Sequence, residues 1–535
     1  MWQQTYTPLG SVGASALVAA APIFVLLLLL AVFKRPAWLS ALCGLATALA
    51  VALFMYGMPF GLALSATTYG AAFGLFPIGW IVLWAIVLYR ITVETGKFEI
   101  IKDSIGGLTR DSRLQALLIA FAFGAFIEGA AGFGTPVAVA SAMLTGLGFS
   151  PFRAAAICLL ANTAPVAFGS IGIPLVTLQG ITKLPLNELS ADVGRICAPV
   201  SLFIPAYLIL VMGGWRALSG VLPAALLCGL AFASAQFFVS NYLGPYLTDI
   251  IGALASLGVL VGLLQFWKPK EIHANSDVLP KKHATREVIL AWSPYGLLVI
   301  FVLLWGWTDM KALLSQATQQ FGWPGLHGMI QRMPPVVGKP SSYDAIYKLD
   351  FLAASGTSCM LAAFASAMVL KVSVARFIGV FVATLKQLAF SFLTMATVLG
   401  LAFLMNYSGA TATLGLAFAA TGVAFPFFSA LLGWLGVFLT GSDTSANALF
   451  GNLQVVTAGT LGLKPVLMAA SNSSGGVMGK MISLQSIAVA CAATGMSSAD
   501  ESKLFRFTLR HSVFLASVIG LIVLLYSYVI PGVAF

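Results

Sequence analysis

The stretch E-G-A-A-G-F-G-T-P, residues 128–136, lies inside an apolar run that extends from 114 to 148. A second polar stretch, T-G-S-D-T-S-A-N at 440–447, lies inside the apolar run 426–460. Glycine and proline interrupt a helix and free backbone N–H and C=O groups. Lipid cannot satisfy these groups, so they are tolerated only where they are packed in protein or line a cavity. We therefore predict two re-entrant hairpins whose tips lie in the protein interior.

The composition around these stretches is that of a membrane protein. Of the 535 residues, 59% are hydrophobic and only 8% are charged, against about 25% charged residues in a soluble domain. A soluble enzyme, a disordered scaffold and a coiled coil are thereby excluded. The net charge of +11 comes from Lys and Arg in short gaps between apolar runs, as the positive-inside rule expects. No nucleic-acid partner is predicted.

The apolar runs predict an all-α polytopic membrane protein with about 12 full spans and two re-entrant hairpins. The most polar stretch, 267–287, is the clearest cytoplasmic loop. If this loop lies in the cytoplasm, the other basic loops also lie there only when each hairpin enters and leaves the membrane on the same side. Both termini then lie outside, as does the longer loop 307–349.

A shift of 312 residues relates two halves of the chain, and it places the broken run 114–148 on 426–460. Three spans lie between the two units, and this odd number turns the second unit upside down. An inverted repeat with broken helices in matching places is typical of secondary transporters, whose site lies near the bilayer midplane. The predicted organisation is an extra N-terminal span (1–37), a first repeat (38–215) with a broken helix at 154–178, three connecting spans with the two loops (216–349), and a second repeat (350–535) with a broken helix at 465–492.

Three charged residues stand at lipid depth: Glu128, Asp443 and Lys480. A charge at the bilayer centre costs at least about 2.5–3.5 kcal/mol, so it usually faces a cavity or a partner. Burial favours the neutral form of a carboxyl group, which suits Glu128 and Asp443 to carry protons. Lys480 can neutralise an anionic substrate, or it can pair with one of the acids and only fix the fold.

The polar residues beside these charges are the candidate substrate ligands. They are Thr135, Asn162, Thr163, Ser442, Thr444, Ser445, Asn447, Asn472, Ser473, Lys480 and Gln485. We expect broken-helix N-termini near Asn162 and Asn472 to direct amide N–H groups at an anion. Close helix packing would explain the glycines and serines of these stretches, but not the added Glu, Asp, Asn and Lys. The chain shows no nucleotide-binding loop and no cysteine or histidine ligand spacing, so neither a cofactor nor a metal site is predicted.

Several long runs resemble the L-lactate permease family, and the resemblance covers nearly the whole chain. The runs are E-G-A-A-G-F-G-T-P at 128–136, N-T-A-P-V-A-F-G at 162–169, R-M-P-P-V-V at 332–337 and W-L-G-V-F-L-T-G-S-D-T-S-A-N-A-L-F at 434–450. The resemblance implies proton-coupled uptake of L-lactate, D-lactate and glycolate across the bacterial inner membrane. It also implies a branch of the ion-transporter superfamily, whose sodium-dicarboxylate members carry Ser-Asn-Thr at the hairpin tips. Leu484 stands where that pattern leads us to expect proline, which leaves the break in the last broken helix open.

The sequence therefore predicts a secondary transporter, a proton symporter of small 2-hydroxymonocarboxylates, rather than an enzyme. One alternative is a sodium-coupled carrier of di- or tricarboxylates, which would need more fixed positive charge than Lys480 offers. Another is a membrane-embedded enzyme that uses Glu128 and Asp443. A homo-oligomer is compatible with the sequence, and an elevator motion rests on fold analogy alone.

Overall fold

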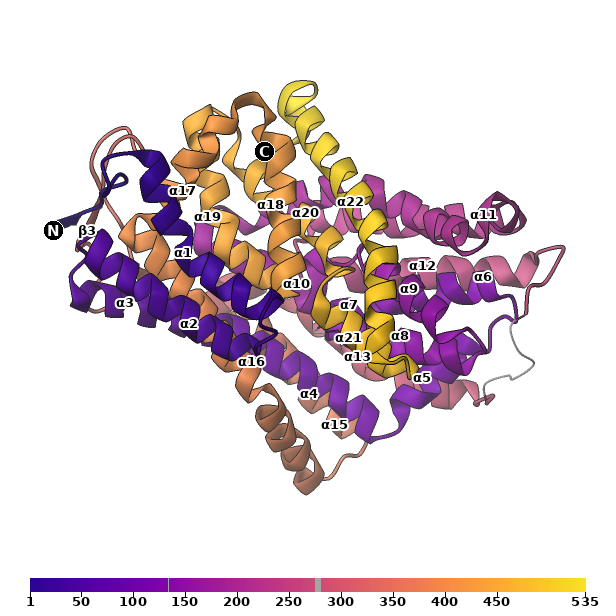
Figure 1. The fold of residues 1–535 in the computed structure, drawn as a ribbon. Helices are drawn as coiled ribbons and strands as arrows, with labels where there is room; N and C mark the ends of the chain where they lie inside the picture. Colours follow the sequence, from indigo (N-terminus) through magenta and orange to yellow (C-terminus); the bar gives the residue numbers. More distant parts are fainter. Residues whose placement is uncertain (133, 275–280) are drawn as a thin grey trace.

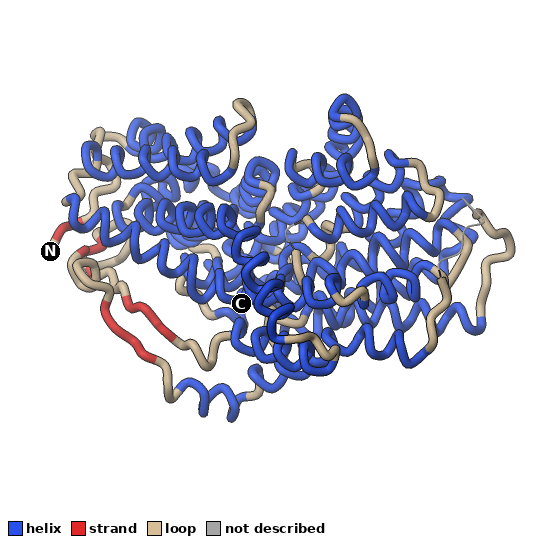
Figure 2. Tube along the Cα trace, turned by 90° about the horizontal axis from the view of Figure 1, so that it is seen from below, coloured by secondary structure: helices blue, strands red, loops and turns tan. Residues whose placement is uncertain are grey.

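The computed structural model describes residues 1–132, 134–274 and 281–535, which are mostly helical (Figures 1 and 2). Phe133 of the predicted first hairpin tip and residues 275–280 of the predicted cytoplasmic loop lie outside the described residues. Eleven helical segments of the described chain are long and apolar enough to cross a membrane, or 12 when the bent pair Pro151–Ala161 and Val166–Thr182 is taken as one span. The prediction of an all-α, multi-pass membrane protein is confirmed.

The first third of the chain contains ten α-helices within the described residues. They are α1 (Val12–Ala31), α2 (Ala37–Ala50), α3 (Phe60–Phe73), α4 (Trp80–Glu94), α5 (Lys97–Gly106), α6 (Ser112–Gln115), α7 (Gly124–Ala130), α8 (Thr135–Gly146), α9 (Pro151–Ala161) and α10 (Gly169–Thr182). Segments with π-helical turns extend α2 and join α3 to α4 and α6 to α7. Pro36 and Pro59 directly precede α2 and α3, because proline lacks an N–H and fits the start of a helix.

The middle of the chain holds long spanning helices and a small strand region. The helices are α11 (Leu186–Tyr242), α12 (Thr248–Phe266), α13 (Thr285–Gly306) and α14 (Thr308–Ser315). At 57 residues, α11 would be about 85 Å long if straight, far more than the ~30 Å bilayer core. It breaks at Gly213 and Gly214, where Gly214 has a φ of 69°. The break divides α11 into two segments, as the hydropathy of this region predicts.

The loop 307–349 carries four short strands, and a fifth comes from the N-terminus (Figure 2). They are β1 (Trp2–Gln3), β2 (Gln319–Gly322), β3 (Ile330–Arg332), β4 (Ser341–Ser342) and β5 (Ile346–Leu349). Strand β1 pairs parallel with β3, β3 pairs antiparallel with β4, and β2 pairs antiparallel with β5. The N-terminal segment is thereby joined to this loop by backbone hydrogen bonds.

The last third of the chain contains eight α-helices within the described residues. They are α15 (Ser355–Val369), α16 (Val374–Ser408), α17 (Ala410–Phe418), α18 (Phe425–Thr440), α19 (Asp443–Leu461), α20 (Pro465–Lys480), α21 (Leu484–Thr494) and α22 (Ser498–Tyr528). The hydropathy of the sequence predicts a span only from 389 to 405 in the range of α16. The helix starts 15 residues earlier, at Val374, because Arg376 and Lys386 interrupt the apolar run without interrupting the helix.

The helix boundaries of the two halves correspond at the shift of 312 residues. The shift moves α5 from 97–106 to 409–418, where the structure has α17 at 410–418. It moves the start of α11 from 186 to 498, which is the first residue of α22. Both ranges predicted as hairpins hold two helices separated by a short break, α7 and α8 in the first range and α18 and α19 in the second, and the two helices of each pair are in contact. The inversion of one half relative to the other stays a prediction.

The helices pack into two groups. Helices α2, α3 and α4 pack against the long α16, and α15 packs against α4 (Figure 1). The second group is formed by α7 to α12 from the first half and α18 to α22 from the second half. Helix α10 packs against α19, so broken segments from the two halves of the chain meet inside the second group.

The start of the first helical hairpin is anchored by a buried ion pair. Arg113 Nη2 lies 2.7 Å from Asp111 Oδ2, and their side chains are 5% and 1% exposed. The His273 backbone N–H also donates to Asp111 Oδ2 at 3.1 Å, and Arg113 Nη2 donates to the Glu271 carbonyl at 2.8 Å. Burial raises the pKa of Asp111, but the hydrogen bonds from Arg113 and His273 outweigh it and hold the pKa below its usual value. These contacts tie the polar loop after α12 to the hairpin.

The substitution Arg113→Ala should destabilise the protein by about 3–5 kcal/mol, because it leaves the Asp111 carboxylate buried without its partner. Thermal unfolding of the purified protein in detergent measures the effect. The matched control is Lys102→Ala, which removes a partly exposed pair with Glu99 and should cost about 0–1 kcal/mol. Equal melting temperatures for the two variants would contradict an anchoring role for Arg113.

Candidate functional site

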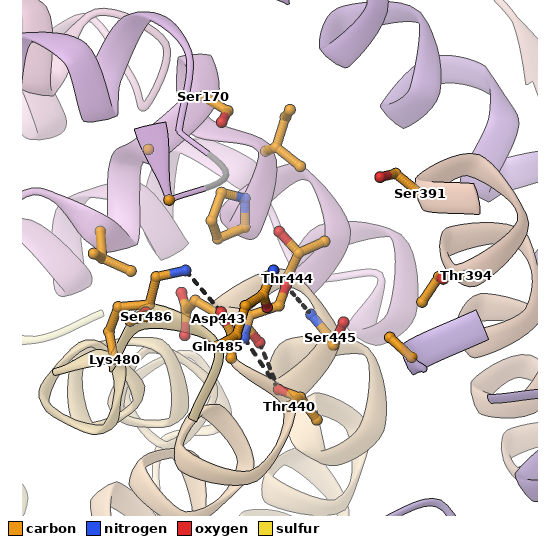
Figure 3. A pocket seen from close by; sticks show the side chains of 18 of the residues that line it. Ser170, Ser391, Thr394, Thr440, Asp443, Thr444, Ser445, Lys480, Gln485 and Ser486 are labelled. Atoms are coloured by element: carbon orange, nitrogen blue, oxygen red, sulfur yellow. Dashed lines mark hydrogen bonds between the residues drawn. The ribbon is translucent and has the colours of Figure 1, made fainter. Parts of the chain in front are cut away.

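A cavity of about 180 Å³ lies between the two helix groups (Figure 3). It is small beside the ~300–1,000 Å³ of pockets for drug-sized ligands, and it suits a small solute. Helix α16 contributes Ser391 and Thr394, which lie across the cavity from Asp443 and Thr444 (Figure 3). The polar and charged residues of the lining are Glu128, Ser170, Ser391, Thr394, Thr440, Ser442, Asp443, Thr444, Ser445, Lys480, Gln485 and Ser486.

Several helices begin at this cavity. Gly134 precedes α8, Ser442 caps α19, and Gln485 lies in the first turn of α21; all three residues line the cavity. The irregular start of α10 at Gly169 and Ser170 also lines it. Each helix N-terminus carries roughly half a positive charge and free N–H groups. The cavity is therefore an environment that favours an anion.

The expectation of helix N-termini near Asn162 and Asn472 is wrong. Asn162 caps the C-terminal end of α9, and Asn472 lies within the continuous helix α20. The helix starts belong to the next segments, α10 and α21. A residue just before a break lies at the C-terminal end of one helix, and a residue just after it lies at the N-terminal end of the next. Hydropathy does not locate the break to the exact residue, so it cannot tell the two cases apart.

The break of the last broken helix lies at Met481–Ser483. Ser483 is the N-cap of α21, and its side chain accepts a hydrogen bond from the Ser486 backbone N–H at 3.2 Å. Leu484 is the first residue of α21. A serine cap satisfies an N–H at the helix start, so the break does not need the proline that the family pattern would place at 484.

Lys480 lies at the last turn of α20 and points across the hairpin tip. Its Nζ donates a hydrogen bond to the Gly441 carbonyl at 2.7 Å. Gly441 is the C-cap residue of α18. The side chain is 8% exposed. Among the ion pairs of the described residues, none involves Lys480. Its positive charge therefore remains available to a ligand in the cavity.

The two predicted acids line the same cavity. Asp443 Oδ2 accepts hydrogen bonds from Ser473 Oγ at 2.5 Å and Asn447 Nδ2 at 3.4 Å. The other oxygen, Asp443 Oδ1, and Glu128 Oε2 are buried and have no hydrogen-bond partner among the described residues. Gly169 lies against Glu128, since a Cβ added there would be 2.7 Å from Glu128 Oε1.

A buried polar network stands behind Asp443. Asn472 Nδ2 donates to Asn447 Oδ1 at 2.9 Å, and Gln454 Nε2 donates to Asn472 Oδ1 at 3.0 Å. Ser429 Oγ donates to Gln454 Oε1 at 2.7 Å. The network fixes the orientation of Asn447, and through it the position of the Asp443 carboxylate.

The structure divides the predicted ligands into two sets. The residues that line the cavity are Ser442, Thr444, Ser445, Lys480 and Gln485, together with Glu128 and Asp443. The residues outside the lining are Thr135, Asn162, Thr163, Asn447, Asn472 and Ser473. Of these, Asn447, Asn472 and Ser473 hold Asp443 in place, and Asn162 is buried beside Glu128. Thr163 Oγ1 donates to the Leu160 carbonyl at 2.8 Å.

Six polar residues are absent from the predicted site residues: the buried acid Asp249 and five residues of the lining, which are Ser170, Ser391, Thr394, Thr440 and Ser486. Ser391 and Thr394 line the cavity from α16, and their spacing of three in an apolar helix is the only sequence signal for them. Asp249 is 1% exposed although it stands at the start of an apolar run, where hydropathy places it at the membrane border.

Direct backbone contact between α18 and α20 positions Lys480 and Asp443. Three glycines, Gly433, Gly475 and Gly479, face the backbone of the opposite helix, and a Cβ at any of them would collide with a carbonyl oxygen there. Small residues permit such close approach of helices in a membrane. The contact sets where α20 ends relative to the tip at Gly441.

The model of the L-lactate permease family matches residues 15–530. The chain belongs to the L-lactate permease family. It is 45% identical to the glycolate permease GlcA of Escherichia coli (strain K12), with 99% of each chain covered. It is also 45% identical to the L-lactate permease of Bacillus subtilis (strain 168), with 99% of this chain and 100% of the relative covered. Membership of a permease family makes the protein a transporter rather than an enzyme.

Two solved transporter structures resemble this one more distantly. The YdaH transporter of Alcanivorax borkumensis gives a TM-score of 0.45 at 13% identity, over 86% of both chains. MtrF of Neisseria gonorrhoeae gives a TM-score of 0.45 at 12% identity, over 88% of this chain and 83% of that one. The family assignment rests on the sequence relatives.

The substitution Gly475→Ala should abolish transport, because the added Cβ pushes α20 away from α18 and moves Lys480 away from the tip. Overpacking of this kind costs about 1–3 kcal/mol. Substrate uptake and melting temperature should be measured together. The control is Gly459→Ala on the exposed face of α19, where an added Cβ meets nothing within 4 Å. Normal uptake by the Gly475 variant would show that the helix contact does not position the site.

Proposed function

We propose that the protein is a proton symporter of L-lactate and related 2-hydroxymonocarboxylates, D-lactate and glycolate, in the bacterial inner membrane. The observation that carries the proposal is the cavity that combines helix N-termini, one unpaired lysine and two buried acids. The names of the relatives, L-lactate permease and glycolate permease, support the substrate class. Both termini are proposed to lie outside.

The cavity has the groups that a small hydroxy acid requires. Lys480 and the helix N-termini would bind the single carboxylate, because both present positive charge to the cavity. The hydroxyl groups of Ser442, Thr444 and Ser445 and the Gln485 amide can exchange hydrogen bonds with the substrate hydroxyl. A di- or tricarboxylate would need more fixed positive charge than Lys480 provides, which disfavours the sodium-coupled alternative.

Proton coupling is supported by the charge of the site. Glu128 and Asp443 are 4% and 3% exposed, and each has an oxygen without a hydrogen-bond partner among the described residues. An ionised carboxylate in such a place is costly, and protonation removes the cost. A proton on one acid would also remove the repulsion between that acid and an incoming lactate anion. Substrate and proton would therefore bind together.

The position of the cavity supports an elevator motion. One side of the lining comes from α2 and α16, and the other comes from the hairpins and broken helices. Movement of the second helix group along α16 would carry the bound substrate past Ser391 and Thr394. In a homo-oligomer, contacts between protomers would hold the first helix group in place while the second group moves.

The variant Glu128→Gln should lose lactate accumulation driven by a proton gradient and should retain lactate–lactate exchange. The amide keeps the shape of the side chain but cannot carry a proton. The measurement is uptake into proteoliposomes under separate proton and sodium gradients, with Glu94→Gln, an exposed acid, as control. Accumulation by the wild-type protein under a sodium gradient at uniform pH and zero potential would contradict proton symport.

The variant Lys480→Met should weaken lactate binding roughly 10–100-fold, the loss of one charge-assisted hydrogen bond of about 1.5–3 kcal/mol. Lys480→Arg should restore only part of the affinity, because the guanidinium is larger and planar. Binding is measured on purified protein by calorimetry.

The double variant Lys480→Met with Asp443→Asn separates a ligand role of Lys480 from a structural one. If Lys480 contacts lactate, the double variant should bind as weakly as Lys480→Met. Restored binding in the double variant would show that Lys480 serves only to balance Asp443.

A further inference from the structure

Asp249 is a buried acid for which the proposed mechanism has no role. It lies in the first turn of α12 and is 1% exposed. Both of its carboxylate oxygens lack a hydrogen-bond partner among the described residues. It does not line the cavity. A buried carboxyl group without any donor is rare in proteins and needs an explanation.

Asp249 packs against the hairpin helix that carries Glu128. A Cβ added at Gly129 would lie 2.8 Å from Asp249 Cβ and 3.1 Å from Ile250 Cγ1. The absence of a side chain at Gly129 thus lets the backbone next to Glu128 contact α12 directly. Glu128 is also the charged group that acts electrostatically on Asp249. The two acids therefore form a neighbouring pair, with Glu128 on the cavity side.

No positively charged side chain of the described residues faces Asp249. Helix α12 packs against α7, α10, α11 and the segment 116–123. The titratable groups that face Asp249 from these elements, within the described chain, are Glu128 on α7 and Cys197 on α11. Lys480 interacts with Glu128 and Asp443 instead. Two adjacent buried carboxylates cannot both be ionised at low cost, so Glu128 and Asp249 must hold at least one proton between them.

Two effects act on the charge state of Asp249 in opposite directions. Burial favours the neutral acid, whereas the N-terminus of α12 favours the carboxylate. The helix N-terminus thereby lowers the cost of the ionised form, which a group that accepts a proton and later releases it must also adopt.

We propose that Asp249 is a second proton-carrying residue, which exchanges the coupled proton with Glu128. The two carboxyl groups share no hydrogen bond, so the proton passes through a bridging water. Glu128 gives its proton to the water, the water gives a proton to an Asp249 carboxylate oxygen, and Glu128 becomes the carboxylate and Asp249 the neutral acid. The proton then resides on the side of Glu128 that faces away from the substrate. This inference rests on the proposed proton symport and adds the route by which the proton reaches and leaves the cavity.

The test compares Asp249→Asn, Asp249→Glu and Glu128→Gln in proteoliposomes. The control is Asp309→Asn, an exposed acid in the first turn of α14. Three quantities are measured for each variant: lactate–lactate exchange at equal pH, the initial rate of uptake under a proton gradient, and the pH profile of that uptake.

Asp249→Asn should keep exchange, should lower proton-driven uptake at least about tenfold as expected for the loss of a proton-transfer group, and should flatten the pH profile. Asp249→Glu should recover part of the uptake and the pH dependence. Asp309→Asn should match the wild type.

Normal proton-driven uptake by Asp249→Asn would overturn the role of Asp249. Equal loss of exchange and uptake in both Asp249 variants would also overturn it, because it would indicate a structural residue. A wild-type protein that accumulates lactate without any proton gradient would instead contradict the proposed function, so the two failures are distinguishable.

Discussion

Helices α18 and α20 are in backbone contact, and the geometry of the site depends on that contact. Gly433, Gly475 and Gly479 remove the side chains that would hold the two helices apart. As a result the C-terminal turn of α20 reaches the tip between α18 and α19, where Lys480 Nζ meets the Gly441 carbonyl. Apolar side chains provide little driving force between helices in lipid, so close packing and buried hydrogen bonds must hold them together. The network of Ser429, Gln454 and Asn472 supplies such hydrogen bonds.

The electrostatics of the site follow from the low polarity of its surroundings. Glu128, Asp249 and Asp443 are buried, and Lys480 is the lysine of the described chain that interacts with Glu128 and Asp443. In this setting an unpaired charge is expensive, and proton binding is the least costly way to remove it. A lactate anion that enters beside three ionised acids would meet strong repulsion. The same helix N-termini that attract the anion cannot offset that repulsion alone, since each supplies only about half a charge.

Some polar residues line the cavity and others form hydrogen bonds within the protein, and the difference depends on where they lie along their helices. Hydroxyl-bearing residues at the start of α19 point into the cavity, where the helix begins and its N–H groups are free. The amides Asn447 and Asn472 lie one turn or more further from the tip, where the helices contact one another. Their hydrogen bonds are made within the protein, and they act on a ligand only through Asp443.

Much of this protein could be predicted from the sequence because the responsible properties are local. Hydropathy predicts the membrane-spanning helices, and Gly, Pro and isolated polar residues predict where these helices break. Glu128, Asp443 and Lys480 are conspicuous because a charge in an apolar run is costly wherever it lies. The period of 312 residues is visible for the same reason, since it is a pattern of breaks along the chain. The tertiary structure alone decides which end of each broken helix faces the cavity, and it places Asn162 and Asn472 away from the helix starts. It also brings Ser391 to the cavity, and Asp249 to the helix that carries Glu128, from distant parts of the chain. Such proximity depends on how helices remote in sequence pack together, and no local pattern of residues records it.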